Sequence, residues 1–376
     1  MERQASKMEN MGIVNSLQTF YTGKRILITG HTGFKGSWLS KILLNWGAEV
    51  IGVSLPPHTN PNLFEALSLN KDITKNYFFD LRHVDKLREV MEIEKPEIVF
   101  HLAAQAIVRD SYDDPFNTHS TNILGTLNVL QAIKEVGSVK SAVVITTDKV
   151  YENKEWLYPY REVDALGGYD PYSASKAAAD IVTNSYLQSF FNPKNFGETH
   201  HTLVAIARAG NVIGGGDWGK DRLIPDMIKA VFERQETVVI RNPQAIRPWQ
   251  HVLDPLRGYL MLGRELYNGQ KELSGAWNFG PNEDSFVCVE ALVKSGLAVL
   301  KKGDYKIAED ISLKHEANLL KLDINKAGNM LDWRPRWQFN DSLQATFEWY
   351  GQFYANDNLI NNFTNKQIKL YFSDEK

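Results

Sequence analysis

An α/β fold built on a doubly wound parallel sheet is predicted by three features of the sequence. Short apolar runs of strand length alternate with helix-length stretches over roughly the first two hundred residues. The runs are apolar throughout, which is typical of parallel strands that are buried on both faces. The first run leads into a glycine-rich turn and then a helix. We therefore expect a sheet with helices on both faces.

The expected strands and helices follow one another along the chain. The strands are Arg25–Thr29, Glu49–Ser54, Tyr77–Asp80, Ile98–Leu102, Ala142–Thr146, Leu203–Arg208 and Val238–Arg241. The helices are Ile13–Tyr21, Ser37–Trp46, Val84–Glu94, Pro115–Val136 and Pro171–Phe190. In the second helix, apolar residues recur at the spacing of one helical face.

The regular alternation weakens after about residue 210, which indicates a change of domain. We expect an N-terminal extension over 1–20 and a larger domain over 21–208, with returning segments at about 235–260. A smaller C-terminal α/β domain is expected over 209–354, followed by a polar and peripheral tail over 355–376.

Composition excludes several classes of protein. The single cysteine, Cys288, rules out a disulfide within the chain and argues against a cysteine-based zinc site, so we expect no metal. The net charge of −3, without a long basic run, argues against binding to nucleic acid. No apolar stretch approaches the ~18 residues of a membrane span, and the first twenty residues lack a signal core. We expect a cytoplasmic protein with no membrane contact.

The glycine-rich turn predicts a dinucleotide-binding site in a Rossmann-type domain. It reads Gly30, His31, Thr32, Gly33, Phe34, Lys35 and Gly36, between the first strand and the first long helix. Glycines let the backbone approach a diphosphate closely, and the helix N-terminus supplies free N–H groups and a positive dipole end. The G-x-x-G-x-x-G spacing resembles that of extended short-chain dehydrogenase/reductases.

An acidic residue for the adenosine ribose is missing from the end of the second strand, where it is expected about twenty residues after the glycines. Ser54 offers a weaker contact there. No arginine follows at once to accept a 2′-phosphate, which favours NAD modestly over NADP. Asp80 and Leu81 follow the third strand and could receive the adenine edge, although Asp80 could equally cap a helix.

Tyr172 and Lys176 form a Y-x-x-x-K pair one helical turn apart, so their side chains share a face. A phenol is a poor base at neutral pH, but a nearby ammonium favours its ionised form. Such a pair is a common chance match, and its value here comes from its position at the start of a long helix. Asp170 and Pro171 fit the N-cap and first position of that helix.

Asp148 and Lys149 follow the fifth strand, after Thr147. Ligands of open parallel sheets bind at the carboxyl ends of the strands. An acid beside an amine can supply one proton and remove another, although a capping aspartate and a solvated lysine would look the same. The nearby tyrosine pair and glycine turn favour catalysis.

A family resemblance runs from about residue 20 to 352. Its segments are Gly30–Leu39, His101–Gln105, Val108–Arg109, Thr121–Thr126, Thr147–Tyr151, Asp170–Lys176, Arg208–Trp218, Arg222–Asp226, Arg247–Val252 and Trp333–Trp337. They resemble CDP-glucose 4,6-dehydratases, which are extended short-chain dehydrogenase/reductases. Lysine at position 149 is the distinguishing feature, because the resembling dTDP-glucose and GDP-mannose enzymes carry glutamate there.

The resemblance implies an NAD-dependent dehydration of CDP-glucose that serves deoxysugar biosynthesis, including that of O-antigen. Tyr172 would remove the O4 proton with Thr147 bound to O4, Lys149 would take the C5 proton, and Asp148 would protonate the leaving hydroxyl. It implies further cofactor contacts from Ala103, Ala104 and Asn122, and a homodimer formed through the two long helices. The implied contacts to the CDP-sugar come from Gln105, Arg109, Arg208, Asn211, Arg222, Leu223, Arg241 and Arg247.

Each of these arginines could equally form a salt bridge. Arginine suits a diphosphate because its planar guanidinium binds phosphate oxygens in pairs, and the resemblance favours Arg247 over Arg208 for this role. Two other functions stay open: a nucleotide-sugar 4-epimerase, which would need Tyr172 and Lys176 without the acid–amine pair, and a non-catalytic NAD-binding regulator.

Overall fold

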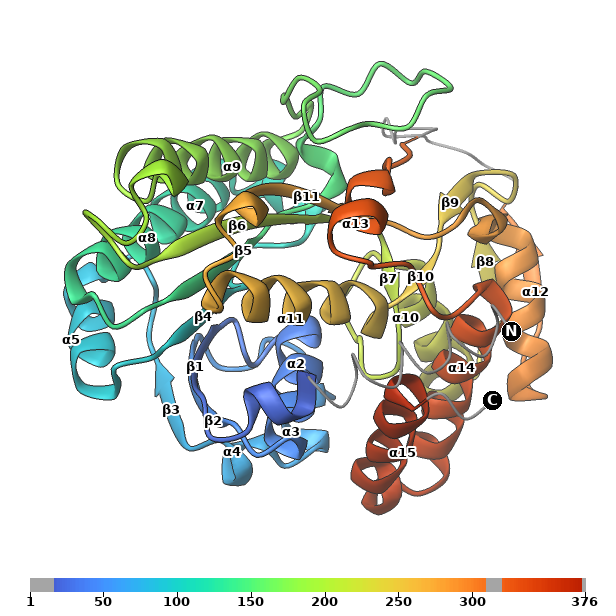
Figure 1. Cartoon of the computed structure of the whole chain (residues 1–376). Helices are drawn as coiled ribbons and strands as arrows, with labels where there is room; N and C mark the ends of the chain where they lie inside the picture. Colours follow the sequence, from blue (N-terminus) through green and yellow to red (C-terminus); the bar gives the residue numbers. More distant parts are fainter. Residues whose placement is uncertain (1–16, 309–319, 374–376) are drawn as a thin grey trace, which may run out of the picture.

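The computed structural model describes residues 17–308 and 320–373, and its centre is a seven-stranded parallel sheet (Figure 1). The strand order is β11-β6-β5-β4-β1-β2-β3. The strands are β1 (Arg25–Thr29), β2 (Glu49–Ser54), β3 (Lys75–Phe78), β4 (Ile98–His101), β5 (Ser141–Ile145), β6 (Leu203–Ala209) and β11 (Gly275–Phe279). The order reverses between β1 and β4, so the carboxyl ends of these strands form the crevice in which such sheets bind ligands. The predicted doubly wound fold is confirmed.

Helices cover both faces of this sheet (Figure 1). One face carries α2 (Phe34–Asn45) and α11 (Leu253–Tyr267). The other carries α5 (Val84–Glu94), α8 (Gly125–Val136) and α9 (Pro171–Ser189). Consecutive residues of β1 separate the two cores, because Ile26 and Ile28 pack with the first set and Leu27 with the second. A strand buried on both faces reads as a continuous apolar run, as Ile26, Leu27 and Ile28 do in β1.

The helix expected over Pro115–Val136 contains a π-helical turn. It consists of α7 (Pro115–His119), the π turn Ser120–Leu124 and α8. Asp114 caps its start by accepting a hydrogen bond from the Asn117 N–H at 2.9 Å. Such turns add one residue to a helix and are frequent at functional sites.

The remaining elements are short or belong to the C-terminal part. Near the main sheet lie α3 (Leu63–Ala66), α4 (Leu69–Asp72), α6 (Val108–Asp113) and the 3₁₀ turns Asp148–Val150 and Pro193–Asn195. Beyond it lie three two-stranded sheets: β7 (Val212–Ile213) with β10 (Gln250–His251), β9 (Ile246–Pro248) with β12 (Phe286–Cys288), and β8 (Val238–Ile240) with β13 (Tyr305–Ile307). The other helices are α10 (Leu223–Ile228), a π turn (Lys229–Arg234), α12 (Val289–Leu300), α13 (Asn325–Met330), α14 (Phe339–Ala355) and α15 (Ile360–Phe372). The 3₁₀ turns Lys271–Leu273, Glu283–Ser285 and Asp357–Leu359 complete the described elements.

Two sequence expectations about the sheet and the tail are wrong. The strand expected over Val238–Arg241 forms as β8, but it pairs with β13 outside the main sheet, and β11 fills the seventh place instead. The tail is not peripheral, because α15 buries Ile368, Tyr371 and Phe372 in the main core. The Tyr371 hydroxyl donates to a carboxylate oxygen of buried Asp254 at 2.6 Å.

Two smaller expectations concern the ends of the chain and the membrane. Residues 17–21 are helical, and the rest of the helix expected over Ile13–Tyr21 lies outside the described residues. Within residues 17–308 and 320–373, no helix is both long enough and apolar enough to cross a membrane. The domain boundaries stay a prediction.

Candidate active site

The glycine turn is packed so closely that side chains are excluded from it. Gly30 has a φ of +76°, and a Cβ there would lie 2.7 Å from the Ala103 backbone nitrogen. A Cβ on Gly36 would lie 2.1 Å from the Gly30 carbonyl oxygen. The helix α2 begins at Phe34 with no side-chain cap and no acidic residue in its first turn. These features fit a diphosphate at the helix N-terminus.

His31 lies beneath this turn. Its imidazole is fully buried between the rings of Phe64 and Phe78, and Nε2 is 3.1 Å from the Asn76 side-chain oxygen. Burial lowers the pKa of His31 to about 4, so the ring is neutral at physiological pH. The ring therefore supports the turn from within the core, and a contact of His31 with a cofactor stays a prediction.

The expected adenosine contacts are engaged with neighbouring groups. The Ser54 hydroxyl is 2.9 Å from that of Thr32, which also bonds the Leu55 carbonyl. Asp80 forms a 2.6 Å ion pair with Arg82 and accepts its backbone N–H. The alternative role of Asp80 as a helix cap is wrong, because α5 begins at Val84, four residues later, and its N-cap is His83. Contacts of Ser54, Asp80 and Leu81 with a cofactor stay predictions.

Asn122, in the π turn, connects two parts of the site. Its side-chain oxygen accepts the Gln105 N–H at 2.8 Å, and its amide donates to the Gln105 carbonyl and to the Ser175 hydroxyl. It therefore holds the loop after β4, with Ala103 and Ala104, against the start of α9. The Gln105 side chain is itself engaged with the Ile107 backbone.

The start of α9 carries the tyrosine and lysine as expected. Asp170 caps the helix by accepting the Ser173 N–H at 2.9 Å, and Pro171 is the first helical residue. Both predictions are confirmed. Lys176 is buried, and its Nζ donates to the Ile145 carbonyl, at the end of β5, at 2.8 Å. The lysine is thereby fixed between helix and sheet.

Thr147, Asp148 and Lys149 lie next to this pair, in the short turn that follows β5. The Thr147 hydroxyl donates to the Asp148 carboxylate at 2.9 Å, and a hydrogen bond between Thr147 and Tyr172 lowers the pKa of the tyrosine. The structure therefore brings together the two groups of residues that the sequence singled out separately.

Burial dominates the acid–base properties of the site. It raises the pKa of Tyr172 to about 12 against the opposing effects of Thr147 and Arg222. It also raises the pKa of Asp148, which Lys149, Thr147 and Lys35 partly offset. Burial thus favours the neutral phenol of Tyr172. It also favours the protonated carboxyl of Asp148, relative to the same group in water.

Lys35 extends from the glycine turn toward this centre. Burial lowers its pKa to about 8, the charge of Asp148 opposes that effect, and the charge of Arg222 adds to it. Lys35 in turn adds to the effect of burial, which lowers the pKa of Lys176 to about 8. Its ammonium therefore interacts electrostatically with Asp148 and Lys176 as well as lying at the start of α2.

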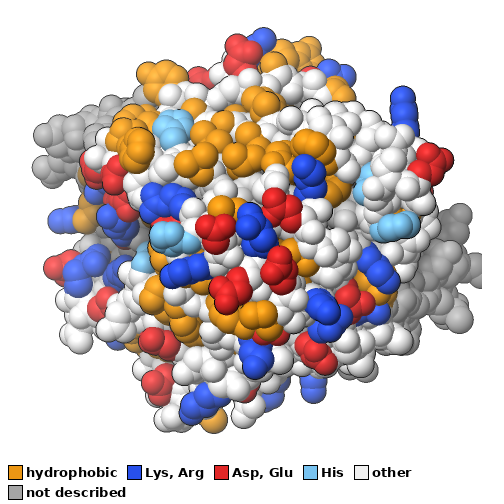
Figure 2. Space-filling view, turned by 90° about the vertical axis from the view of Figure 1, so that its left-hand side faces the viewer, with side chains coloured by type: hydrophobic (Ala, Val, Ile, Leu, Met, Phe, Trp, Pro, Cys, Tyr) orange, Lys and Arg blue, Asp and Glu red, His pale blue; other side chains and the backbone are white. Residues whose placement is uncertain are grey.

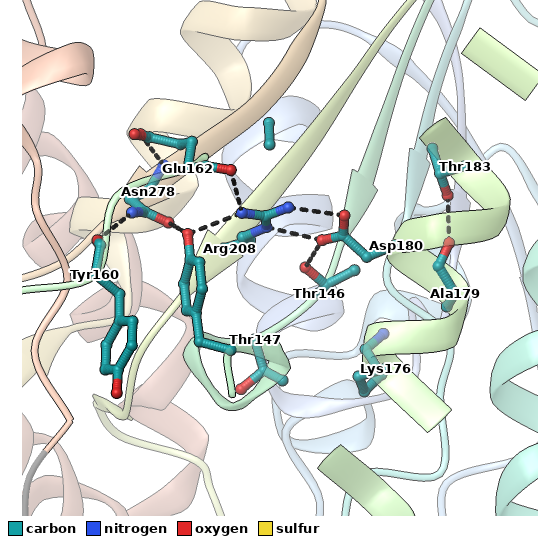
Figure 3. A network of polar contacts seen from close by, with 12 residues as sticks. Thr146, Thr147, Tyr160, Glu162, Lys176, Ala179, Asp180, Thr183, Arg208 and Asn278 are labelled. Atoms are coloured by element: carbon teal, nitrogen blue, oxygen red, sulfur yellow. Dashed lines mark hydrogen bonds and ion pairs between the residues drawn. The ribbon is translucent and has the colours of Figure 1, made fainter. Parts of the chain in front are cut away.

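Arg208, one of the expected substrate contacts, forms a buried ion pair, which is the alternative that the sequence left open for it. It is 3% exposed and binds both carboxylate oxygens of Asp180, at 2.8 and 2.9 Å (Figure 3). Its remaining nitrogen donates to the Tyr151 hydroxyl and the Glu162 carbonyl. All three guanidinium nitrogens are thus engaged inside the protein.

Two of the other expected substrate residues form ion pairs. Arg109 pairs with Asp221 and Arg222 with Asp217, both at 2.7 Å. The remaining candidates are half-buried Asn211, Leu223 and Arg247 and exposed Arg241. Their contacts with substrate stay predictions.

Sequence reasoning missed several buried polar residues that organise the site. His101, at the end of β4, is held between the hydroxyls of Thr29 at 2.7 Å and Thr126 at 2.9 Å. Burial lowers its pKa to about 3. In the sequence, His101 stands out only through the family resemblance, and no local pattern pairs it with Thr29 and Thr126, which lie 72 and 25 positions away.

A metal site is not apparent where side chains are described. Across residues 17–308 and 320–373, no group of three or more histidine, cysteine, aspartate and glutamate side chains is placed to hold an ion.

Comparisons with known proteins agree with this arrangement. The family model described as GDP-mannose 4,6 dehydratase matches residues 27–346. A CDP-glucose 4,6-dehydratase of Salmonella typhimurium is 46% identical over 91% of this chain and 95% of its own. A dTDP-glucose 4,6-dehydratase of the same organism is 25% identical over 90% and 95%.

Solved structures share the fold at lower identity. The dTDP-glucose 4,6-dehydratase DesIV from Streptomyces venezuelae, with NAD and TYD bound, gives a TM-score of 0.74 at 23% identity and covers 90% of this chain and 99% of its own. The epimerase Mth375 from Methanothermobacter thermautotrophicus gives 0.76 at 23% identity, covering 92% and 97%.

Proposed function

This chain belongs to the GDP-mannose 4,6 dehydratase family, and we propose that it converts CDP-D-glucose to CDP-4-keto-6-deoxy-D-glucose. One observation carries the proposal: the turn with Asp148 and Lys149 lies against the start of the helix with Tyr172 and Lys176. A tyrosine–lysine pair suits hydride transfer, and an acid–amine pair suits elimination of water. Both are needed in one site for a 4,6-dehydration.

NAD fits the glycine turn as the cofactor. Gly30 and Gly36 leave backbone where side chains would block a diphosphate, and the start of α2 has no capping side chain. Bound NAD would accept the C4 hydride at the start of the cycle and return it to C6 at the end. Lys176 and Asn122 would line the nicotinamide end of this site.

In the oxidation step, Tyr172 accepts the O4 proton while Thr147 holds O4. Because burial raises the pKa of Tyr172 to about 12, its ionised form has to develop together with ligand binding. The charge of Arg222 and the hydrogen bond with Thr147 both lower the pKa of Tyr172 and so favour that form. Fixing Lys176 on the Ile145 carbonyl keeps its charge at a constant place beside the reaction.

In the elimination step, the 4-ketone acidifies the C5 hydrogen, and Lys149 takes it as a proton. Asp148 gives its proton to the departing C6 hydroxyl, so that the C6–O bond breaks and water leaves. Burial raises the pKa of Asp148, which favours the protonated form that this role requires. The proton on Lys149 then returns to C5 as hydride is delivered to C6.

The substrate diphosphate would be bound by Arg247, with Asn211 and Arg222 nearby. Gln105, Arg109, Leu223 and Arg241 would complete the surroundings of the sugar and the cytidine. The choice of CDP-glucose over other nucleotide sugars is supported by the 46% identity to the Salmonella enzyme and by Lys149. We expect the protein to act in the cytoplasm.

The nearest alternative is a 4-epimerase of the same fold, and isotope transfer separates the two functions. CDP-glucose deuterated at C4 should deliver the label to C6 of a 4-keto-6-deoxy product. Release of the label into free NADH would contradict hydride return. Formation of CDP-galactose without a 6-deoxy product would establish epimerisation, and parallel reactions with dTDP-, GDP- and UDP-glucose would test the base.

We also propose a homodimer through the long helices. Exposed hydrophobic side chains include Phe116 on α7, Leu124 in the π turn and Ile181 on α9, with exposed fractions of 81%, 48% and 55%. Figure 2 shows hydrophobic side chains gathered in the upper part of one side of the molecule, above a more charged region. Burying such a surface in a symmetric four-helix interface would stabilise a pair of subunits. Sedimentation of a monomer alone at micromolar concentration would contradict it.

A further inference from the structure

A buried ion pair links the strand β6 to the helix α9. Arg208 on β6 and Asp180 on α9 are 3% and 1% exposed and share two hydrogen bonds, at 2.8 and 2.9 Å (Figure 3). A buried pair with two parallel hydrogen bonds has a fixed geometry, and losing either partner leaves a buried charge uncompensated. The pair can therefore act as a rigid reference point inside the protein.

The turn that carries Asp148 and Lys149 is attached to this pair at both ends. Before the turn, the Thr146 hydroxyl donates to Asp180 at 3.3 Å. After it, the Tyr151 hydroxyl accepts a hydrogen bond from Arg208 at 2.8 Å. The two attachment points lie on either side of the proposed elimination residues.

The other catalytic pair is attached to the same reference point through α9. Asp180 lies one helical turn after Lys176 and two turns after Tyr172, so the three side chains share a face. Lys176 is also bound to the Ile145 carbonyl, immediately before Thr146. The ion pair thus fixes the position of one catalytic pair relative to the other.

The turn depends on these attachments because its own hydrogen bonds are long. The Val150 N–H to Thr147 and the Tyr151 N–H to Asp148 carbonyl distances are both 3.4 Å. Tyr172 and Lys176, in contrast, belong to a capped helix of 19 residues. Loosening the attachments should therefore displace Asp148 and Lys149 before it displaces Tyr172 and Lys176.

A second set of contacts supports Tyr151. Its hydroxyl donates to the Asn278 side chain on β11 at 2.7 Å, and its ring stacks on that of Tyr160, 5.2 Å away. Asn278 donates to the Tyr160 carbonyl and to the Glu162 carboxylate (Figure 3). The segment between the turn and α9 is thereby held to the same network.

We infer that Thr146, Tyr151, Asp180 and Arg208 form a positioning unit that aligns the elimination residues with the oxidation residues. These four side chains act through Asp148 and Lys149 and need not touch the substrate. The inference rests on the proposed dehydratase function. It assigns to Arg208 a role in positioning Asp148 and Lys149 relative to Tyr172 and Lys176, instead of a role in binding diphosphate.

The test uses two substitutions that remove one hydroxyl each and keep the ion pair. Thr146→Val and Tyr151→Phe, alone and together, are compared with wild type in a single turnover with CDP-glucose. Quenched samples are assayed for the 4-keto-glucose intermediate and the 4-keto-6-deoxy product. Because a misplacement of ~1 Å can cost ~10²-fold, we expect elimination to slow by about 10-fold or more in the double variant. Oxidation should change by no more than about 2-fold, so the intermediate accumulates.

Thr183→Val is the matched control. Its hydroxyl is also buried on α9, but it donates to the Ala179 carbonyl of its own helix at 2.7 Å (Figure 3). The control should keep the wild-type ratio of intermediate to product. A double variant that also keeps this ratio, or that loses oxidation and elimination equally, would overturn the inference. A wild-type protein that oxidises no CDP-glucose would refute the proposed function instead.

Discussion

The two regions that carry the proposed catalytic residues are built in different ways. Tyr172 and Lys176 lie in a long helix with an aspartate cap and a proline at its first position. Asp148 and Lys149 lie in a three-residue turn with long backbone hydrogen bonds, and side chains from other elements hold it. Local sequence determines the first region, whereas tertiary contacts determine the second. Oxidation and elimination should therefore respond differently to substitutions.

The largest expected difference comes from the catalytic residues themselves. Tyr172→Phe removes the proposed base for oxidation, so bound NADH should not form. Lys149→Met removes only the proposed base for elimination, so some bound NADH should form without release of product. Each activity should fall by ~10²–10⁴-fold, measured as product formation and as absorbance of reduced nicotinamide.

Substrate affinity needs a separate measurement for these variants, because Lys149 also carries charge that could help to hold the substrate. If Lys149→Met dehydrates CDP-glucose at nearly the wild-type rate, the lysine is not the base. The distinction between the two regions would then lose its chemical basis.

A glycine between the two regions should be sensitive to a single added methyl group. A Cβ on Gly168 would lie 2.1 Å from the backbone of Ser173 and Ala174, at the start of α9. We expect Gly168→Ala to lower the free energy of unfolding by about 3 kcal/mol, near the upper end of overpacking costs. Thermal unfolding measures the effect.

Gly167→Ala is the control for this substitution. At that position a Cβ would meet Glu152 at an ordinary 3.5 Å. Equal stability of the two variants would show that the segment can shift away from α9, and that the packing against the helix is looser than we describe.

The cap of α9 should make a smaller contribution. Asp170→Ala removes the acceptor for the Ser173 N–H and hydroxyl, and should cost about 1 kcal/mol. Asp170→Asn can still accept the backbone N–H and should recover most of this stability in chemical denaturation. If both variants are equally unstable, the charge at the helix start matters more than the cap.

The smallest expected effect is a pH dependence at Asp148. Burial raises its pKa in the folded protein, so the unfolded chain loses this proton first as the pH rises. Above the ordinary carboxyl pKa, ionisation of Asp148 therefore favours unfolding. The stability of Asp148→Asn relative to wild type should rise as the pH increases above about 4, the ordinary carboxyl pKa. A difference that stays constant over this range would contradict the role of burial.

The sequence predicted those parts of the fold that depend on local patterns. Helix Val84–Glu94 is confirmed at both ends, and the start of α9 is confirmed because Asp170 and Pro171 signal it directly. The place of β8 could not be predicted in the same way. Its apolar sequence fits either sheet, and only its pairing with Tyr305–Ile307 decides between them.

The same limit explains the site. Thr147, Asp148 and Tyr172 were found because each stands at a recognisable strand end or helix start. The sequence could not decide between a phosphate contact and an ion pair for Arg208, because its partner Asp180 lies on another element, 28 residues away. An arginine at the end of a buried strand looks the same in the sequence whether it binds phosphate or a buried carboxylate.

The π turn at Ser120–Leu124 sets a limit on how the length of this chain can vary. A single residue advances an α-helix by about 100°. Deleting one residue from the turn would restore a regular helix, but everything on one side would rotate by that amount relative to the other. Asn122 would then leave Gln105 and Ser175, or α8 would turn its buried face away from the sheet. Related chains should therefore differ in length in their surface loops and keep the number of residues between Pro115 and Val136 unchanged.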